Sequence, residues 1–140
     1  MINCIASLTD PNGDKWNFDF LIMVASDTLG ISKGDWSVEE TQLMQIIAQS
    51  GTAQSLCQEA LSCFQQQQLE TGLNKVHQAQ TCLKAAQKVH GELLQEFAQE
   101  NSTETNLLLI HAEDHLTAAE TIYALMDNFK VIYQQLEGKK

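Results

Sequence analysis

Apolar residues recur at alternating steps of three and four along residues 37–137, and this spacing constrains the fold more than any other feature. It places the residues on one stripe of an α-helix, and a stripe sustained over many turns is typical of left-handed, coiled-coil-like bundles. Three helices of roughly thirty residues would each be about 45 Å long at 1.5 Å per residue. We therefore predict that residues 37–140 form an all-α, antiparallel three-helix bundle of the spectrin-repeat type.

Capping signals and polar breaks mark the boundaries of the three predicted helices. The first begins at Ser37-Val38-Glu39-Glu40, which has the form of a capping box, and ends at four successive glutamines, residues 65–68. The second begins at Leu69 and ends before residues 99–106, a polar stretch whose Ser, Thr and Asn residues favour a new helix start. The third is predicted over residues 105–136.

Each helix carries one stripe that we predict to lie in the core. The stripes comprise Leu43, Ile46, Ile47, Cys57, Ala60, Leu61 and Phe64, then Leu69, Leu73, Val76, Gln80, Leu83, Gln87, His90, Leu94 and Phe97, then Leu108, Ala112, His115, Ala119, Ile122, Met126, Phe129, Tyr133 and Leu136. Further apolar residues lie beside the third stripe: Leu109, Leu116, Tyr123, Leu125 and Ile132. This excess predicts assembly into a larger helical bundle, with a monomeric bundle as the alternative.

Residues 1–36 differ in composition from the helical region and form a separate N-terminal extension. They hold the only proline and both tryptophans, and Asp10-Pro11-Asn12-Gly13-Asp14 is a turn signal between short apolar runs. Two alternatives stay open for this extension, a β-hairpin and a disordered segment.

Charge and cysteine content exclude several classes of protein. The net charge is −10 and the eight basic residues are dispersed, whereas nucleic-acid binding requires clustered Lys and Arg. Four cysteines without a Cys-x-x-Cys spacing are typical of reduced thiols and not of a disulfide framework. No secretory signal or run long enough to span a membrane is evident. We expect a cytoplasmic protein that binds no nucleic acid and does not insert into the membrane.

Residues 107–116, Leu-Leu-Leu-Ile-His-Ala-Glu-Asp-His-Leu, combine four successive apolar residues with two histidines and two acids. Residues three and four apart are neighbours on a helix, so His111, Asp114 and His115 share one face while Glu113 points away from it. Ionisable residues set into a helical packing pattern indicate a chemical site. Three interpretations compete: a core histidine beside a surface acid, a metal site, and a nucleophilic histidine.

The metalloenzyme interpretation matches the sequence least well. A zinc protease requires His-Glu-x-x-His, and Ala112 occupies the place of the glutamate. A di-iron bundle requires two Glu-x-x-His motifs, and the residues three before the four histidines are Asn74, Gln87, Leu108 and Ala112. A nucleophilic role requires less, because an imidazole that is largely unprotonated near neutral pH can accept a phosphoryl group on a ring nitrogen.

Two motifs resemble those of the lactose/cellobiose-type enzyme IIA family of the bacterial phosphoenolpyruvate-dependent sugar phosphotransferase system. Ser50-Gly51-x-Ala53-x-Ser55 is similar to the family's Ser/Ala-Gly-x-Ala-Arg-Ser, and residues 107–116 are similar to its apolar-His-Ala-Gln-Asp-His-Leu. The distance between the motifs also fits without a gap. The resemblance covers residues 37–137.

The resemblance implies a homotrimer that acts as a phosphotransferase in the uptake of a β-linked disaccharide such as lactose, cellobiose or chitobiose. His111 matches the histidine that takes phosphate from the phosphocarrier protein HPr and gives it to a cysteine of enzyme IIB. Asp114 matches an aspartate near the three-fold axis, where some members hold a divalent cation, for which Mg²⁺ is the candidate here. His115 matches the second histidine, which supports the site without accepting phosphate. No nucleotide or organic cofactor is expected.

The chain departs from the family pattern in the second helix and beside the acceptor. The family's Ala-His-x-x-Gln-Thr reads Ala-Gln-Lys-Val-His-Gly at residues 86–91, and we predict that Gln87, His90 and Glu113 support the site. Glu113 replaces a usual glutamine, and Gln54 replaces a usual basic residue. Both changes make the surroundings of a phosphate site more negative. A non-catalytic structural or regulatory trimer of the same fold therefore stays open as the alternative function.

Overall fold

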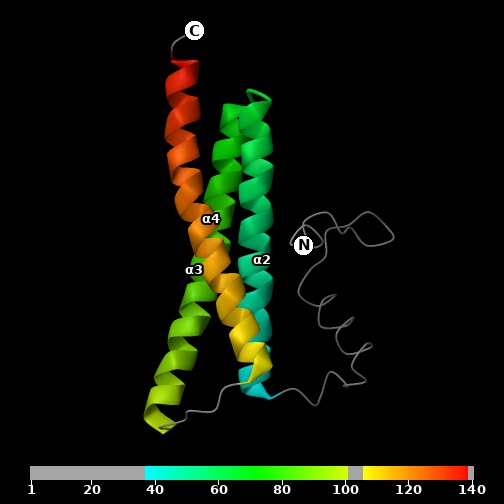
Figure 1. Ribbon diagram of the computed structural model, residues 1–140, viewed down its shortest axis with the longest axis vertical. Helices are drawn as coiled ribbons and strands as arrows, with labels where there is room; N and C mark the ends of the chain where they lie inside the picture. The colour runs from blue at the N-terminus through cyan, green and yellow to red at the C-terminus, as the bar shows by residue number, and fades with distance from the viewer. Residues whose placement is uncertain (1–36, 101–105, 139–140) are drawn as a thin grey trace, which may run out of the picture.

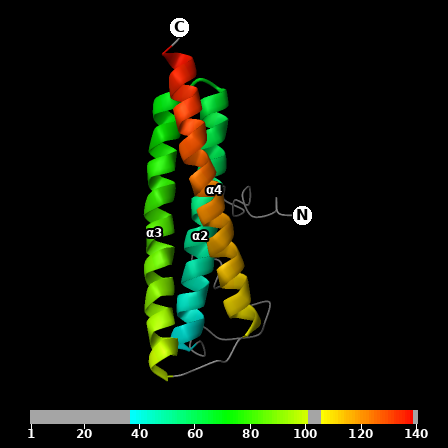
Figure 2. The same ribbon diagram turned by 60° about the vertical axis from the view of Figure 1, so that its left-hand side comes forward.

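The computed structural model describes residues 37–100 and 106–138, which form three long helices packed along one another (Figures 1 and 2). They are α2 (Val38–Gln65), α3 (Leu69–Glu100) and α4 (Leu107–Glu137). Successive helices run in opposite directions, so α2 and α4 are parallel (Figure 1). The predicted all-α arrangement of three packed helices is confirmed. The alternatives given for residues 1–36 lie outside the described residues.

Capping side chains determine where α2 and α4 begin. Ser37 Oγ accepts a hydrogen bond from the Glu40 N–H at 3.1 Å, and the Glu40 carboxylate accepts one from the Ser37 N–H at 2.8 Å. At α4, Asn106 Oδ1 accepts from the Leu109 N–H at 2.8 Å. These amides have no partner within their helices, so the caps stabilise each start. The predicted capping box is confirmed.

The turn between α2 and α3 forms without glycine or proline. Gln67 adopts a φ of 60°, in the left-handed region. Its N–H donates to the carbonyl of Phe64 at 3.0 Å, and the Gln68 N–H donates to the carbonyl of Cys63 at 2.9 Å. These bonds satisfy the last carbonyls of α2 and offset a backbone cost of about 1–2 kcal/mol for a residue other than glycine. The predicted break at residues 65–68 is confirmed, whereas α3 continues through Glu100, past the predicted end.

Two clusters of buried side chains form the core. One contains Leu43, Ile46, Ala53, Leu83, Ala86, Val89, Leu93, Ala112, Leu116 and Ala119, and the other contains Leu56, Cys57, Ala60, Phe64, Val76, Ala79 and Met126. Cys82 and Tyr123 pack against both clusters and join them. Full burial of each large aliphatic or aromatic side chain contributes about 1.5–3 kcal/mol, so these clusters stabilise the bundle over most of its length.

The buried stripe of α3 differs from the predicted one. It consists of Gly72, Val76, Ala79, Leu83, Ala86, Val89 and Leu93. The placement of Gln87 and Leu94 in the core was wrong, since Gln87 is exposed and the Leu94 side chain is 51% exposed. Small residues explain the difference, because Gly72, Ala79 and Ala86 let α3 approach its neighbours closely. The predicted stripe followed the large apolar residues and therefore left these small residues out.

The buried stripe of α4 is shorter than predicted. Its buried residues are Ala112, Leu116, Ala119 and Met126, so Leu116 belongs to the core and not beside it. Phe129 and Leu136, predicted to be core residues, are 37% and 55% exposed. No described α4 residue beyond Met126 is buried. The second half of α4 therefore presents apolar surface that α2 and α3 leave uncovered.

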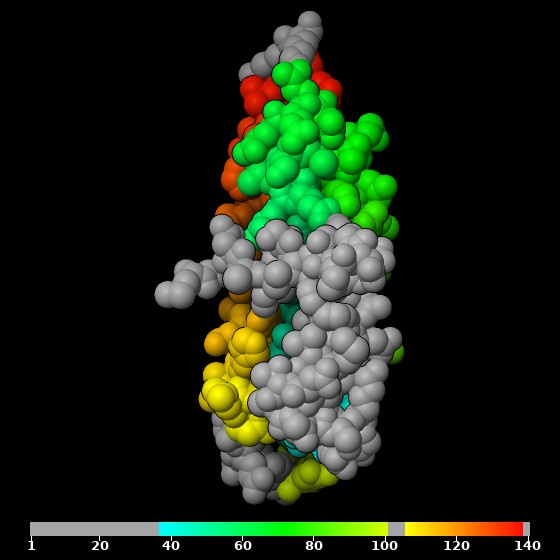
Figure 3. All heavy atoms as spheres, turned by 90° about the vertical axis from the view of Figure 1, so that its right-hand side faces the viewer, coloured from blue at the N-terminus to red at the C-terminus, as the bar shows by residue number. Residues whose placement is uncertain are grey.

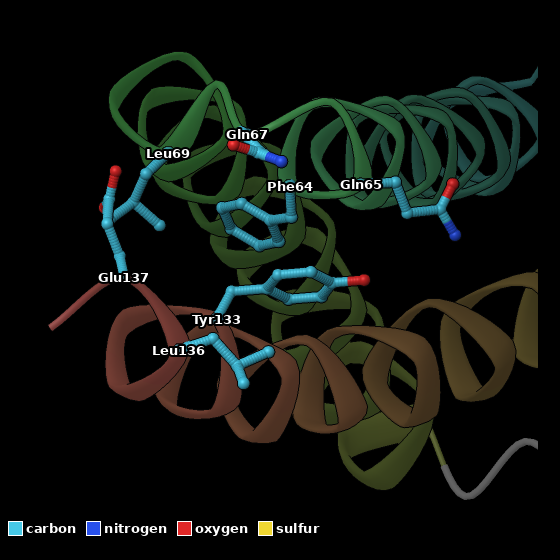
Figure 4. Close-up of a pocket in the computed structure, with 7 residues that line it drawn as sticks. All are labelled: Phe64, Gln65, Gln67, Leu69, Tyr133, Leu136 and Glu137. Carbon is cyan, nitrogen blue, oxygen red and sulfur yellow. The ribbon is translucent and has the colours of Figure 1, made fainter. Parts of the chain in front are cut away.

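A pocket of about 250 Å³ lies where the α2–α3 turn meets the end of α4 (Figure 4). It is lined by Phe64, Gln65, Gln67, Leu69, Tyr133, Leu136 and Glu137. The rings of Phe64 and Tyr133 stack, with 5.4 Å between centroids and 30° between planes. In Figure 3 the end of α4 (red) lies beside this turn (green), and the first residues of α4 (yellow) lie toward the opposite end. The pocket is therefore remote from residues 107–116.

Candidate functional site

The first turns of α4 carry the ionisable residues of segment 107–116. Ala112 is buried in the core, and its burial determines which face of α4 is turned outward. His111 and Asp114 are exposed, and His115 is half-buried. The packing of α4 thus leaves one histidine accessible and holds the other against the bundle. None of the helices α2, α3 and α4 carries a stretch apolar enough for a membrane crossing.

His111 and His115 form an edge-to-face pair. Their ring centroids are 4.6 Å apart and their planes are inclined at 86°. The pair is a local consequence of the helix, because residues four apart stand one turn above each other. It packs the half-buried ring of His115 against the exposed ring of His111 and so restricts the orientation of both.

Burial lowers the pKa of His115 below its usual value of 6.5; the neighbouring His111 lowers it further, and Asp114 acts in the opposite direction. The geometry agrees, because His115 Nδ1 is buried without a hydrogen-bond partner among the described residues. A proton on this nitrogen would be buried and unpaired, which disfavours the charged ring. His115 is therefore a predominantly neutral neighbour of His111 near neutral pH.

Gln54 links α2 to α4 at the level of the histidine pair. Its side-chain N–H donates to the backbone carbonyl of His115 at 3.0 Å. Ser50 and Ala53, from the α2 motif identified in the sequence, are fully buried nearby along α2. Small buried residues of this kind allow neighbouring helices to approach closely. Sequence reasoning missed the contact of Gln54 with His115, because spacing along α2 does not reveal which residue faces α4.

Two polar contacts join α3 to α4. His90 Nε2 lies 2.7 Å from Glu113 Oε1, with side chains 24% and 42% exposed. Gln87 Nε2 donates to Glu120 Oε1 at 2.8 Å. Glu113 thus faces α3, away from the side of His111, as the helical spacing indicates. Glu120 was not identified from the sequence, because nothing along the chain distinguishes it from other surface acids.

Metal-ligating side chains do not cluster in the described helices of one copy. In residues 37–100 and 106–138, no group of three or more His, Cys, Asp or Glu side chains could hold a metal ion. Asp114 offers one exposed carboxylate, which is the kind of ligand that Mg²⁺ prefers.

The sequence also matches known proteins. Residues 41–134 match the family model for "PTS system, Lactose/Cellobiose specific IIA subunit". Over 101 residues the chain is 30% identical to the lichenan-specific phosphotransferase enzyme IIA component of Bacillus subtilis (strain 168), covering 72% of this chain and 92% of the relative. Over 99 residues it is 30% identical to the lactose-specific EIIA component of Streptococcus mutans, covering 69% and 95%.

The bundle is also similar to a solved structure, the crystal structure of the PTS cellobiose-specific enzyme IIA from Bacillus anthracis. The TM-score is 0.70 at 33% sequence identity, and the match covers 78% of this chain and 100% of the other. Both motifs, at residues 50–55 and 107–116, lie inside the region that the family model matches. The chain therefore belongs to the lactose/cellobiose-specific enzyme IIA family and is a phosphotransferase component of the sugar phosphotransferase system.

Proposed function

We propose that His111 takes a phosphoryl group from the phosphohistidine of HPr and passes it to a cysteine of enzyme IIB. One observation carries this proposal: His111 is the exposed member of a histidine pair whose other member, His115, is half-buried. A relay residue must be reached by two proteins in turn. Its exposed position in the first turns of α4 suits this requirement.

The reaction requires little from the chain beyond an unprotonated nitrogen placed for in-line approach. In the first step, the P–N bond of phospho-HPr breaks as a P–N bond to His111 forms, and the HPr imidazole leaves with the electron pair. In the second step, the new P–N bond breaks as a P–S bond to the enzyme IIB cysteine forms. No nucleotide takes part, because the phosphoryl group arrives already activated.

An exposed apolar residue beside His111 suits a transient docking surface. Ile110, the residue directly before His111, is 49% exposed. An apolar rim lets a partner protein close over the histidine and exclude water while phosphate is transferred. We propose that HPr and enzyme IIB use this surface in turn, in the cytoplasm.

An exposed apolar stripe on α4 supports assembly into a trimer. Leu107, Leu125, Ile132 and Leu136 are exposed. At 100° per residue, all four lie within about 40° of Asp114 around the helix. In an assembly of three copies, this stripe would pack along the three-fold axis and bring three Asp114 carboxylates together. Burial of the stripe between copies would supply a driving force for assembly.

Mg²⁺ fits the donor that Asp114 provides. Three converging carboxylates repel one another, and an oxygen-preferring cation would neutralise that repulsion. Each Asp114 lies one turn from His111, so its neutralisation would also ease the approach of a phosphate. Asp114 is the residue of this chain that would hold the ion.

The transported sugar in this proposal is a β-linked disaccharide or a related oligosaccharide. Two relatives are named for lichenan and lactose, and the similar solved structure is named for cellobiose. Selection of the sugar falls to the membrane subunit of such systems and not to a phosphate carrier.

Transfer from phosphoenolpyruvate tests the proposal. Incubated with phosphoenolpyruvate, enzyme I and HPr, the chain should gain the mass of one phosphoryl group, and acid should remove it. Addition of enzyme IIB should discharge it, and a mixture without HPr is the control. A chain that stays unmodified with active HPr would instead favour the non-catalytic trimer.

A further inference from the structure

We propose that His90 of α3 is a positioning residue for phosphoryl transfer, which holds the Glu113 carboxylate and offsets its negative charge beside His111. This inference deepens the proposed function and rests on His111 being the acceptor. It assigns a role to an ion pair that the transfer chemistry itself does not use.

Glu113 introduces a charge that opposes the reaction. It follows His111 by two residues and points to the opposite side of α4, so its carboxylate lies farther from the His111 ring than the distance of about 5–6 Å between their Cα atoms. A phosphoryl group carries up to about two negative charges near neutral pH, and a like charge beyond that distance on a partly buried helix face still repels it, although more weakly. The enzyme IIA family motif has a neutral glutamine at the position of Glu113. The carboxylate of this chain therefore needs compensation.

His90 is placed to supply that compensation. Its Nε2 lies 2.7 Å from Glu113 Oε1, within the range of a charge-assisted hydrogen bond. The ring donates an N–H to the carboxylate and, in its protonated form, adds a counter-charge. Both side chains are partly buried, so solvent screens the pair less than it screens a fully exposed one. The contact also draws Glu113 toward α3, away from the outward face of His111.

A neighbouring basic residue of α3 pairs with a different acid. Lys88 lies two residues before His90 in the sequence, and its Nζ is 3.8 Å from the Glu92 carboxylate. Its side chain is also largely exposed. The basic side chain that the structure places against Glu113 is that of His90.

The second contact between α3 and α4 offers an internal comparison. Gln87 donates to Glu120 at 2.8 Å, so it joins the same helices by a bond of similar length. Glu120 lies about two turns farther along α4 than Glu113. The carboxylate near His111 has an imidazole partner, and the distant carboxylate has a neutral amide. If both contacts only held the helices together, an amide would serve as well as an imidazole at either position. An imidazole, which can carry a positive charge, is found at the carboxylate nearer to His111, as charge compensation predicts.

A cycle of amide substitutions separates charge from hydrogen bonding. The four proteins are the wild type, His90→Gln, Glu113→Gln and the double variant. In each of them residue 90 keeps an N–H donor and residue 113 keeps a side-chain oxygen that can accept it. The measurement is kcat and KM for phosphoryl transfer from phospho-HPr. His90→Gln leaves the carboxylate uncompensated and should lower kcat/KM by about three- to tenfold, chiefly through KM. Glu113→Gln and the double variant should match or exceed the wild type.

Three further variants or conditions serve as controls. Glu120→Gln removes a carboxylate two turns away and should leave kcat/KM unchanged. His90→Lys places a cation beside Glu113 and should not lower kcat/KM, which keeps the test decisive if His90→Gln folds poorly. Raising the salt concentration from ~0.05 M to ~0.5 M should reduce the difference in kcat/KM between His90→Gln and the wild type. Salt screens charge–charge repulsion but does not affect a purely mechanical contact.

Two results would overturn the inference. Equal losses in His90→Gln and Glu113→Gln, or a double variant no better than His90→Gln, would mean that the contact acts only as a tether. If the wild type is phosphorylated on His111 but all four proteins of the cycle have the same kcat/KM, His90 has no positioning role. The proposed function would then stand. A wild type that is not phosphorylated on His111 would instead remove the proposed function itself.

Discussion

The rings of His111 and His115 meet edge to face, with centroids 4.6 Å apart, one helical turn from each other. The two rings also interact electrostatically, because a charge on His111 affects the pKa of His115. Burial is the larger cause that lowers the pKa of His115, and His111 lowers it further. The exposed histidine therefore stands beside a neighbour that resists protonation, so the two rings do not both carry charge near neutral pH.

The first prediction concerns stability at acid pH. Because the pKa of His115 is lower in the folded chain than its unfolded value of 6.5, the unfolded chain binds more protons between the two values. The contribution of His115 to the free energy of unfolding is fully present above about pH 6.5. It declines as the pH falls toward the pKa of His115 in the folded chain. Urea denaturation between about pH 5 and pH 7.5 should show a weaker pH dependence for His115→Gln than for the wild type. Equal slopes, or an NMR titration that placed the pKa of His115 above 6.5, would contradict this.

The second prediction concerns two glycines of α3. A Cβ at Gly72 would overlap the ring of Phe64 and lie 3.1 Å from the carbonyl oxygen of Ala60, whereas a Cβ at Gly91 would meet nothing within 4 Å. Phe64 is 2% exposed and cannot move aside freely. Gly72→Ala should lower the free energy of unfolding by about 1–3 kcal/mol. Gly91→Ala, the matched control, should raise it by about 0.5–1 kcal/mol. Urea denaturation measures both, and a neutral Gly72→Ala would disprove the close packing of α2 and α3.

The third prediction concerns the thiol of Cys57. Burial, with a smaller contribution from Asp127, raises its pKa from 9.0 to about 11. Since the thiolate is the reactive form, an alkylating reagent at about pH 8 should leave Cys57 unmodified in the native chain. Unfolding in urea should expose it, and peptide mapping would follow both reactions. Modification of native Cys57 as fast as in urea would contradict its place in the core.

Sequence alone predicted the start of α2 and the break after it, because both depend on local chemistry. The Ser37–Glu40 capping box and the glutamine break each act over a few residues. In contrast, α3 runs past its predicted end to Glu100, and the cap of α4 is Asn106, which the prediction had placed inside the helix. The contact of His111 with His115 follows equally from a spacing of four. Features set within one helical turn or at a helix end can be read before the fold is known.

The rotation of α3 and the contacts between helices could not be predicted in the same way. Gly72 and Ala79 decide which face of α3 is buried, yet neither gives a strong apolar signal. Gln54 and Glu120 meet His115 and Gln87 only because the helices pack at one rotation and one relative height. These contacts depend on the packing of whole helices and not on spacing within one.

The fourth prediction concerns the exposed stripe of α4. Ile132→Glu places a charge on this stripe and should dissociate the proposed trimer, whereas Gln134→Glu, on the other side of α4, should not. Asp114→Leu should preserve or strengthen the trimer, because it replaces a repelling charge with packing. Analytical ultracentrifugation with and without a chelator measures all three. Stable monomers of Asp114→Leu, or a trimer unaffected by Ile132→Glu, would show that the stripe does not lie on the axis.

The position of the phosphoryl group after charging by phosphoenolpyruvate, enzyme I and HPr tests the account most directly. Peptide mapping at neutral pH, which preserves phosphohistidine, should place it on His111. His111→Ala should stay unphosphorylated with unchanged helical content, because the side chain is exposed, while His77→Ala and His90→Ala should still be charged on His111. A phosphoryl group found on His77, His90 or His115 of the wild type, or a charged His111→Ala, would contradict the account.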